Sequence, residues 1–436
     1  MMKRSLYLLG SVYLVAFFAF LAGMYVVMAQ KWPYEHVLNI RNFLVGDQEE
    51  SKTVVEKIEN DLGLKPSRVM ETYLIEPSER DRYSSTDLQF KNSRREAPLV
   101  FLGERRALTG RFIYGALDTT KALHGALLLD SNGGLVHQWH LTDSEDKDPT
   151  RGDGNKYLHG MEVFSDGSLI FSFDGGKGLY KVSACGELVW SIRGNFHHSV
   201  VRDDDNSVWV WRNHDLLKVD IDTGSILNAI SLGAIDKANP ETDIFGIRQH
   251  DKKDRSTWAH DPHHPNDAEP LPRSLVDRFP GFSEGDLLIS LRSINLIFVI
   301  DPTTLKIKWW RVGQWRRQHD PDWGPNGKIY VYDNNMHRGH SNVWRIEPGS
   351  MVADRVVDGE SFNFSSSVMG KQDVFSTGAV LITSPKQGRV FEVFRNEKTF
   401  EFINRYNEAA DEVLVVTGAK FLSNDFFKPD TFDQCE

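Results

Sequence analysis

The sequence predicts an all-β protein, a six-bladed β-propeller preceded by an N-terminal transmembrane helix and a short helical neck. Three observations predict the propeller. A histidine heads the same local pattern four times, at His159, His198, His264 and His319. Short apolar strands with period-two alternation follow, closed by Asp-Gly, Asn-Gly and Thr-Gly turns. The pattern recurs about every 40 to 50 residues, the length of a four-stranded propeller blade.

The first element along the chain is an apolar segment that predicts a membrane anchor. Residues 6–29 carry no charge, and a helix of this length extends about 36 Å, enough to cross a bilayer. Lys3 and Arg4 favour a cytoplasmic N-terminus. We therefore expect residues 1–30 to be a signal-anchor in the inner or plasma membrane, with the C-terminal domain periplasmic or extracellular. A cleaved signal peptide is the alternative, since small residues at 27–29 offer a cleavage position.

Residues 31–95 are charged and heterogeneous, and they predict a neck between anchor and propeller. Apolar residues within 50–64 fall on one helical face, which predicts a short amphipathic helix. These residues are Val54, Val55, Ile58 and Leu62. The helix would pack on the propeller, lie near the membrane, or pair with another subunit in a homo-oligomer, and the sequence leaves all three open. The run 78–87 predicts an exposed linker.

Residues 96–436 predict the propeller itself. Four blades begin at the histidines, another lies near 126–139, and the last lies near 374–393. The strand pattern at 413–422 would complete the first blade and close the ring. The innermost strand of each blade lines the central channel, so the starts of the repeats converge. The histidines should therefore be neighbours in space despite their separation in sequence.

The composition excludes several classes of protein. A net charge of -10 argues against nucleic-acid binding, which needs a basic face. The chain contains neither a P-loop nor a strand-linked GxGxxG fingerprint, so we expect no nucleotide and no other cofactor. Cys185 and Cys435 allow one disulfide in an oxidising compartment, but the sequence alone does not show that these distant residues meet.

Four segments carry a resemblance to a known family. In order they contain Trp258, His264 and Asn266; the strand 288–301 with Arg292; Trp310, Gln318 and His319; and Tyr332, Asp333, Asn334 and Asn335. Their order and spacing resemble those of the bacterial arylsulfate sulfotransferase family. The similarity covers about residues 120–400 and is most specific across 258–335.

The resemblance implies both an activity and a set of site residues. Family members are six-bladed propellers that pass a sulfuryl group between phenols without a nucleotide sulfate donor. For this chain it implies transfer from an aryl sulfate donor to a phenolic acceptor, with His319 as the nucleophile that forms a sulfohistidine. His198, His264 and Arg292 would bind the sulfuryl oxygens, and Asn266 falls on a family active-site position. His159 shares only the repeat position, and we count it with Asn266 as a substrate-binding candidate.

Elementary chemistry favours the same roles. Neutral imidazole, with an ordinary pKa of about 6.5, is available as a nucleophile at neutral pH, and a covalent intermediate divides one difficult displacement into two. Arg292 offers two parallel donors to sulfuryl oxygens. One of the remaining histidines, once protonated, would donate a proton to the leaving phenoxide. The kinetics should be ping-pong.

Two other functions compete with sulfuryl transfer. A metal-dependent hydrolase is one, because potential ligands are dense around 260–267. They are His260, Asp261, His263, His264 and Asp267. Arg292 at the same centre would repel a cation, so we expect no metal site. The other is a non-catalytic binding propeller tethered to the membrane, which fold alone does not decide. Convergent titratable groups argue against a mere scaffold.

The loop at 269–282, between Asn266 and Arg292, departs from the family pattern. We expect it beside the mouth of the channel, where it would reshape the acceptor pocket. The sequence identifies neither donor nor acceptor, and hydrolysis, with water in place of the acceptor, stays open.

Overall fold

The computed structural model describes residues 17, 75, 77–86, 88, 96–117, 124–141, 158–173, 178–246, 262–407 and 412–435. The chain divides into two compact units, Met1–Asn60 and Asp61–Glu436. Of the expected anchor, 6–29, the structure describes only Phe17, which is helical. The expected amphipathic helix at 50–64 lies outside the described residues. Within the described residues, no helix is both long and apolar enough to cross a membrane.

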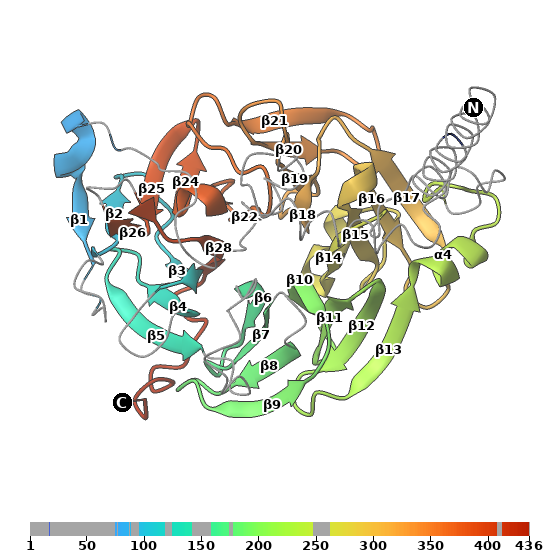
Figure 1. The fold of residues 1–436 in the computed structure, drawn as a ribbon, viewed down its shortest axis with the longest axis horizontal. Coiled ribbons are helices and arrows are strands. Elements are labelled where there is room, and N and C mark those ends of the chain that lie inside the picture. Colours follow the sequence, from blue (N-terminus) through green and yellow to red (C-terminus); the bar gives the residue numbers. More distant parts are fainter. Residues whose placement is uncertain are drawn as a thin grey trace, which may run out of the picture. The chain divides into compact units, whose positions relative to one another are not determined.

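The second unit is a ring of six antiparallel sheets, which confirms the predicted propeller (Figure 1). Blade 1 consists of β28 (Val416–Leu422), β3 (Gly110–Ala116), β4 (His124–Leu129) and β5 (Leu135–Leu141). Blade 2 consists of β6 (Leu158–Val163), β7 (Leu169–Phe173), β8 (Gly178–Val182) and β9 (Leu188–Ile192). Blade 3 consists of β10 (Phe196–Arg202), β11 (Ser207–Arg212), β12 (Asp215–Asp220) and β13 (Ile226–Ser231).

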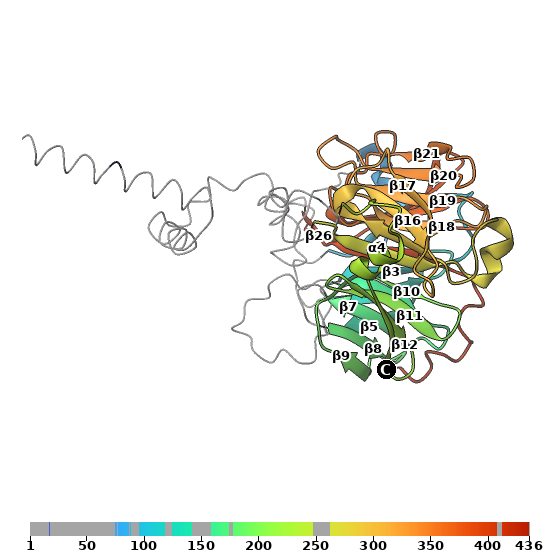
Figure 2. The ribbon, with the colours of Figure 1, turned by 90° about the vertical axis from the view of Figure 1, so that its right-hand side faces the viewer.

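The other three blades follow in chain order. Blade 4 consists of β14 (Pro265–Pro270), β15 (Leu287–Leu291), β16 (Leu296–Ile300) and β17 (Ile307–Val312). Blade 5 consists of β18 (His319–Trp323), β19 (Ile329–Asp333), β20 (Asn342–Ile346) and β21 (Ala353–Asp358), which lie together in the side view (Figure 2). Blade 6 consists of β22 (Lys371–Val374), β23 (Val380–Ser384), β24 (Arg389–Phe394) and β25 (Glu397–Ile403), extended by β2 (Leu99–Leu102) and β1 (Tyr83–Ser85).

Shorter elements lie within or between the blades. They are η2 (Pro77–Arg82), α4 (Leu232–Ala238), η4 (Arg273–Arg278), η5 (Arg292–Ile294), η6 (Pro385–Gln387) and the two-stranded sheet of β26 (Arg405–Asn407) and β27 (Glu412–Val413). Ser231 caps α4, because its side chain accepts a hydrogen bond from the backbone N–H of Ala234.

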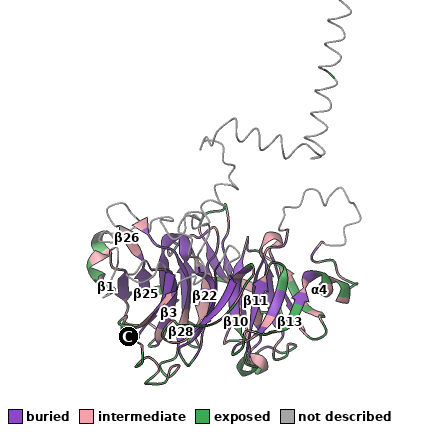
Figure 3. Cartoon of the chain, turned by 60° about the horizontal axis from the view of Figure 1, so that its bottom comes forward, coloured by how far each residue is buried: buried purple, intermediate pink, exposed green. Residues whose placement is uncertain are grey.

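The hydrophobic core is a ring of six clusters among the described residues, each between two neighbouring blades, with a smaller cluster at the outer strands of blade 6. One joins blades 1 and 2 through Trp139 and Phe171, and another joins blades 4 and 5 through Leu288 and Trp323. Burial therefore decreases from the inner strands to outer strands such as β13 (Figure 3). Tryptophans in the outermost strands link neighbouring blades at two places. Trp139 of blade 1 and Trp190 of blade 2 each donate an indole N–H hydrogen bond to a backbone carbonyl in a turn of the next blade.

Both ends of the second unit take part in closing the ring. As predicted, the C-terminal strand β28 pairs with β3 and completes blade 1 as its innermost strand. The N-terminal strand β2 pairs with β25 on the outside of blade 6, and β1 pairs with β2. The run 78–87 was expected to be an exposed linker, and its described residues are exposed or half-buried, but they form most of η2 and all of β1. Blades 6 and 1 are also joined by the buried pair of Arg111 and Glu392, at 2.6 Å.

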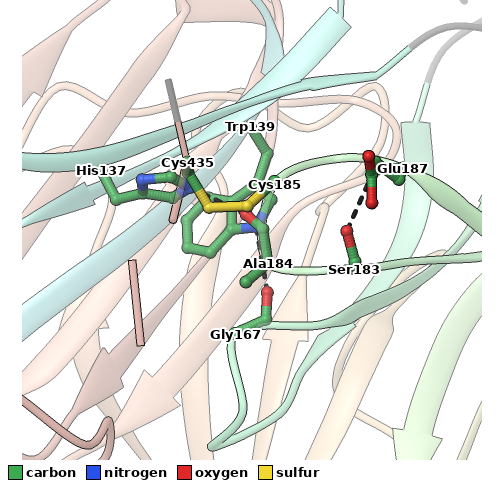
Figure 4. Close-up of a disulfide and its surroundings, with 8 residues drawn as sticks. All are labelled: His137, Trp139, Gly167, Ser183, Ala184, Cys185, Glu187 and Cys435. Atoms are coloured by element: carbon green, nitrogen blue, oxygen red, sulfur yellow. Dashed lines mark hydrogen bonds between the residues drawn. A yellow bond between two sulfur atoms is a disulfide. The ribbon is translucent and has the colours of Figure 1, made fainter. Parts of the chain in front are cut away.

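A disulfide joins Cys185, in the turn between β8 and β9, to Cys435 in the C-terminal tail, which the sequence alone did not show (Figure 4). The tail reaches blade 2 because it is anchored by aromatic contacts on the way. The ring of Phe432 stacks on that of His137 with 4.1 Å between centroids and meets Trp139 edge-on. The tail thus fastens blade 2 to the strand that closes blade 1.

The loop 269–282 lies at the other end of the channel from the position expected. It begins with the last two residues of β14, whereas His264 immediately precedes the first residue of this strand. Its Phe279 packs edge-on against Trp323, at the end of β18, with 4.8 Å between ring centroids. A strand extends by about 3.3 Å per residue, so β14 separates the loop from His264 by its own length. The expectation that this loop borders the end of the channel where the histidines lie was therefore wrong.

Candidate active site

Five of the six innermost strands carry a β-bulge at equivalent positions. The pairing register shifts at 158–160 in β6, 197–200 in β10, 265–267 in β14, 319–322 in β18 and 416–418 in β28. A bulge releases residues from the regular alternation and re-aims their side chains. His198, His264 and Asp320 there adopt positive φ values of 60°, 49° and 50°. Such strain, of order 1–3 kcal/mol per residue, persists where the surroundings impose it and is typical of functional sites.

The bulges bring the four predicted histidines together around His198. Ring centroids lie 4.1 Å from His198 to His159, 4.9 Å to His264 and 5.9 Å to His319. Gly160 makes this approach feasible, since a Cβ there would lie 1.8 Å from the carbonyl oxygen of His198. The rings come from blades 2, 3, 4 and 5, so histidines at the same position of successive repeats lie next to one another in the folded protein.

The orientation and tautomer of His319 are set by Asn334. The Asn334 side-chain amide donates to the carbonyls of Ser366 and Met369, at 2.7 and 2.6 Å. Its Oδ1 must therefore face His319 Nδ1, 2.6 Å away, and because an amide oxygen accepts, Nδ1 carries the proton. The Arg317 carbonyl is a second acceptor for Nδ1 at 3.2 Å. Neutral His319 consequently has its lone pair on Nε2.

A similar chain of hydrogen bonds orients His198. The Asn213 carbonyl lies 2.8 Å from His197 Nε2, so this nitrogen donates. The Nδ1 of neutral His197 is then an acceptor for His198 Nδ1, which is 2.7 Å away. His198 thus also keeps its Nε2 lone pair for other partners. His197 is therefore a positioning residue for His198.

Burial keeps the two central imidazoles neutral. Desolvation lowers the pKa of His319 well below 6.5, and the positive charge of Arg292 lowers it further, whereas the bond to Asn334 raises it. Desolvation also lowers the pKa of His198 well below 6.5, with further lowering by His159, His197, His264 and His319. A neutral histidine with a free Nε2 is nucleophilic, so the site has two such groups at neutral pH.

Asn266 and Arg292 lie beside these rings, in blade 4. Asn266 is 3% exposed and donates to the Gln318 carbonyl at 2.7 Å, which leaves its buried Oδ1 without a hydrogen-bond partner. Gln318 is held in turn by the hydroxyl of Ser290 and the carbonyl of Leu296, both at 3.0 Å. Arg292 begins η5 at the end of β15, and its backbone N–H donates to the carbonyl of His264 at 3.1 Å.

Blades 5, 6 and 1 add residues that the repeat pattern did not reveal. Asp320, Lys371 and Thr417 line the same pocket as His159, His198, Asn266 and His319. Lys371 Nζ lies 2.7 Å from Asp320 Oδ1, and the backbone N–H of Gln372 donates to Asp320 Oδ2. Blades 6 and 1 have no histidine at the head of a repeat. Asn334 did carry a signal, since it stands in the segment that resembles the known family.

The metal-site alternative concerns the potential ligands at 260–267. Among the residues that the structure describes, no three side chains of His, Cys, Asp or Glu are placed to hold a metal ion. His260 and Asp261 lie outside those residues. His263 Nε2 donates to the carbonyl of Phe245 at 2.9 Å and so is engaged in the fold.

Comparisons with known proteins add a family and a fold. Residues 160–405 match the family model described as Arylsulfotransferase (ASST). No curated protein matches the chain. Among solved structures, a Bacteroides caccae protein of unknown function is similar at 10% identity and a TM-score of 0.46, covering 72% of this chain and 99% of that one. A catalytically inactive variant of Staphylococcus aureus virginiamycin B lyase has 9% identity, a TM-score of 0.39, and coverage of 80% and 99%. Similarity at this level does not bear on function.

Proposed function

Because the chain belongs to the arylsulfotransferase (ASST) family, we propose that it transfers a sulfuryl group from an aryl sulfate donor to a phenolic acceptor through a sulfohistidine at His319, without a nucleotide sulfate donor. The observation that carries this proposal is the bond from His319 Nδ1 to a locked Asn334 amide. This bond directs a neutral Nε2 lone pair into a pocket lined by His198 and Asn266.

In the first half-reaction, His319 Nε2 attacks the donor sulfur while the bond from sulfur to the aryl oxygen breaks. The spreading charge falls on the sulfuryl oxygens, to which Arg292 and His264 can donate hydrogen bonds. An arriving anion raises the pKa of His198, which thereby takes up a proton. His198 then donates this proton to the departing phenoxide, so that a neutral phenol leaves.

In the second half-reaction, the acceptor phenol returns a proton to His198 and its oxygen attacks sulfur as the bond from sulfur to Nε2 breaks. The unpartnered Oδ1 of Asn266 is an acceptor suited to orienting that hydroxyl. His319 recovers its original neutral form. Water at the same place would give hydrolysis instead, so the acceptor decides between transfer and hydrolysis.

We further propose that the propeller acts outside the cytoplasm, tethered by residues 1–30 to the inner or plasma membrane. A disulfide between Cys185 and Cys435 supports an oxidising compartment, since reducing cytosol opposes such bonds. A homo-oligomer through the neck would add a second attachment without changing the site.

The full chain, purified in detergent and incubated with 4-nitrophenyl sulfate, tests this mechanism. We expect nitrophenol release that depends on an added phenol, and an intact-mass adduct of one sulfuryl group before acceptor is added. His319→Asn should lose both. His337→Asn is the matched control, because His337 is exposed and its φ of 66° suits asparagine.

Two results would contradict the proposal. A folded His319→Asn variant that keeps the adduct would exclude His319 as the nucleophile. The absence of release and adduct across several aryl sulfates would exclude aryl sulfates as donors and leave the binding propeller as the better interpretation.

A further inference from the structure

A second cavity, which we call the acidic chamber, occupies the channel beyond the bulges. It has a volume of about 300 Å3, at the lower end of the range for small-molecule sites. Six carboxylic acids from four innermost strands line it: Glu162, Asp267, Glu269, Asp320, Asp322 and Asp373. Lys371 and Lys420 are the cationic residues of its wall. Asp320 and Lys371 also line the histidine pocket, so the two spaces share a wall.

The chamber holds more carboxylic acids than cationic groups. Lys371 pairs with Asp320 at 2.7 Å, and Lys420 pairs with Glu162 at 2.6 Å. The other four carboxylic acids have no cationic partner among the described residues. Three of them accept hydrogen bonds from uncharged donors: Glu269 from the backbone N–H of Trp323, Asp322 from the Gln372 amide, and Asp373 from the backbone N–H of Phe421.

Two buried oxygens in the chamber accept no hydrogen bond of normal geometry, although the Ser199 hydroxyl lies close to the Asp267 carboxyl. Asp267 is 2% exposed and Gln372 is 3% exposed, yet Asp267 Oδ1 and Gln372 Oε1 have no hydrogen-bond partner. The Gln372 amide nitrogen is committed to Asp322 Oδ2 and to the Asp320 carbonyl, which fixes where Oε1 points. Leaving a buried polar atom unsatisfied costs about 1–3 kcal/mol, so the chamber is suited to a ligand that supplies N–H donors.

The remaining wall is apolar and aromatic. Tyr114, Trp323, Phe421 and Phe426 lie in it, and aromatic faces attract cations. The carboxylates are spread around this wall, and no three of them among the described residues are placed around one point for a metal ion. The chamber therefore fits an ion with an extended apolar body better than a bare cation.

The geometry points to a binding site for an organic ammonium ion, with the N–H donors near Asp267 and Gln372 and the apolar body against Trp323 and Phe421. This site is separate from the sulfuryl-transfer chemistry and does not depend on it. No anionic donor would be drawn into the chamber, because its uncompensated groups are acidic.

Proton release should accompany binding. Burial, then the charge of Asp320, raises the pKa of Asp267 to about 7, and burial raises that of Asp373 to about 6. Burial also raises the pKa values of Glu269 and Asp322 well above their ordinary range. The other titratable groups that face them are Glu162 on β6, Lys371 on β22, Lys420 on β28 and Tyr114 on β3. An entering cation favours the ionised carboxylate and so displaces a proton.

Isothermal titration calorimetry on the full chain, with 2-phenylethylamine as the probe and 2-phenylethanol as its neutral counterpart, tests this site. We expect the amine alone to bind, with an affinity that rises up to tenfold per pH unit between pH 5.5 and 7. Its apparent enthalpy should depend on the buffer, which reports the released proton. Asp267→Asn should weaken the amine at least tenfold, whereas Asp277→Asn, on the surface of η4, should not.

Each other outcome overturns the inference. Absence of amine binding at millimolar concentration excludes an ammonium site, and equal binding of the alcohol excludes recognition by charge. Amine binding that survives in Asp267→Asn places the site elsewhere. Asp373→Asn is a second variant for the same comparison, should Asp267→Asn not fold. Since the readout is binding, a chain inactive in sulfuryl transfer gives the same answer.

Discussion

Replacing both Cys185 and Cys435 by serine should lower the free energy of unfolding by about 3–5 kcal/mol. The disulfide joins residues 250 positions apart. For a loop of that length, the lost entropy of the unfolded chain corresponds to about 5.5 kcal/mol at 25 °C, which is an upper value. The packing of Phe432 on His137 and Trp139 remains in the variant, so the tail should stay docked.

Urea unfolding of the full chain, followed by tryptophan fluorescence, measures this change. The midpoint should fall, and the slope should rise slightly because an uncrosslinked unfolded chain exposes more surface. The single Cys435→Ser variant should match the double variant, and reduction should bring the native protein to the same midpoint. A decrease of less than about 1 kcal/mol in the free energy of unfolding of the double variant would refute the idea that the disulfide stabilises the folded ring.

Three other predictions follow from the site and the chamber. Asn334→Ala should lower kcat/KM for nitrophenol release about 10- to 100-fold, because His319 loses a buried hydrogen bond worth about 1–3 kcal/mol. An unchanged kcat/KM would exclude a positioning role for Asn334. The acid limb of kcat/KM should have its midpoint below pH 6.5, because burial lowers the pKa of His319 and His198; a midpoint above 6.5 contradicts this. The folded state holds a proton on Asp267 up to a pKa of about 7, which the unfolded state releases near 3.9, so stability falls as pH rises between these values. Asp267→Asn should therefore raise the free energy of unfolding at pH 8 by up to about 4 kcal/mol and leave it unchanged at pH 3.5. Equal effects at both pH values in urea unfolding would refute the argument.

Much of the fold was predictable because propeller strands are short, local and alternating. The pairing of 416–422 with the first blade follows from an apolar strand left over at the end of a repeat array. The strand at 83–85 was missed because it has no apolar alternation and takes its place from β2, itself paired with the distant β25. Whether Cys185 and Cys435 pair could not be predicted for a similar reason, since a separation of 250 residues gives no local signal.

The repeat pattern predicted the site only where it carried a histidine, and Asn266 and Arg292 were predicted from the resemblance to the family instead. His159, His198, His264 and His319 were expected together, and the structure brings them together at the bulges. Lys371 and Thr417 line the same pocket from blades that have no histidine at the head of the repeat, so only the closed ring reveals them. The loop 269–282 was expected at the wrong end of the channel, because closeness to Asn266 in sequence does not show that β14 carries the chain away from the histidines.

The position of β28 has a consequence for how this protein is made. A chain is synthesised from its N-terminus, and the strand that completes blade 1 emerges after all the other strands of the six blades. Cys435, which fastens the tail to blade 2, emerges later still. Until then β3 has no inner partner, and the histidines and the acidic chamber face an open ring. A chain that stops before residue 416 therefore cannot close the ring, and such unfinished chains should be more open to proteases than the closed propeller is.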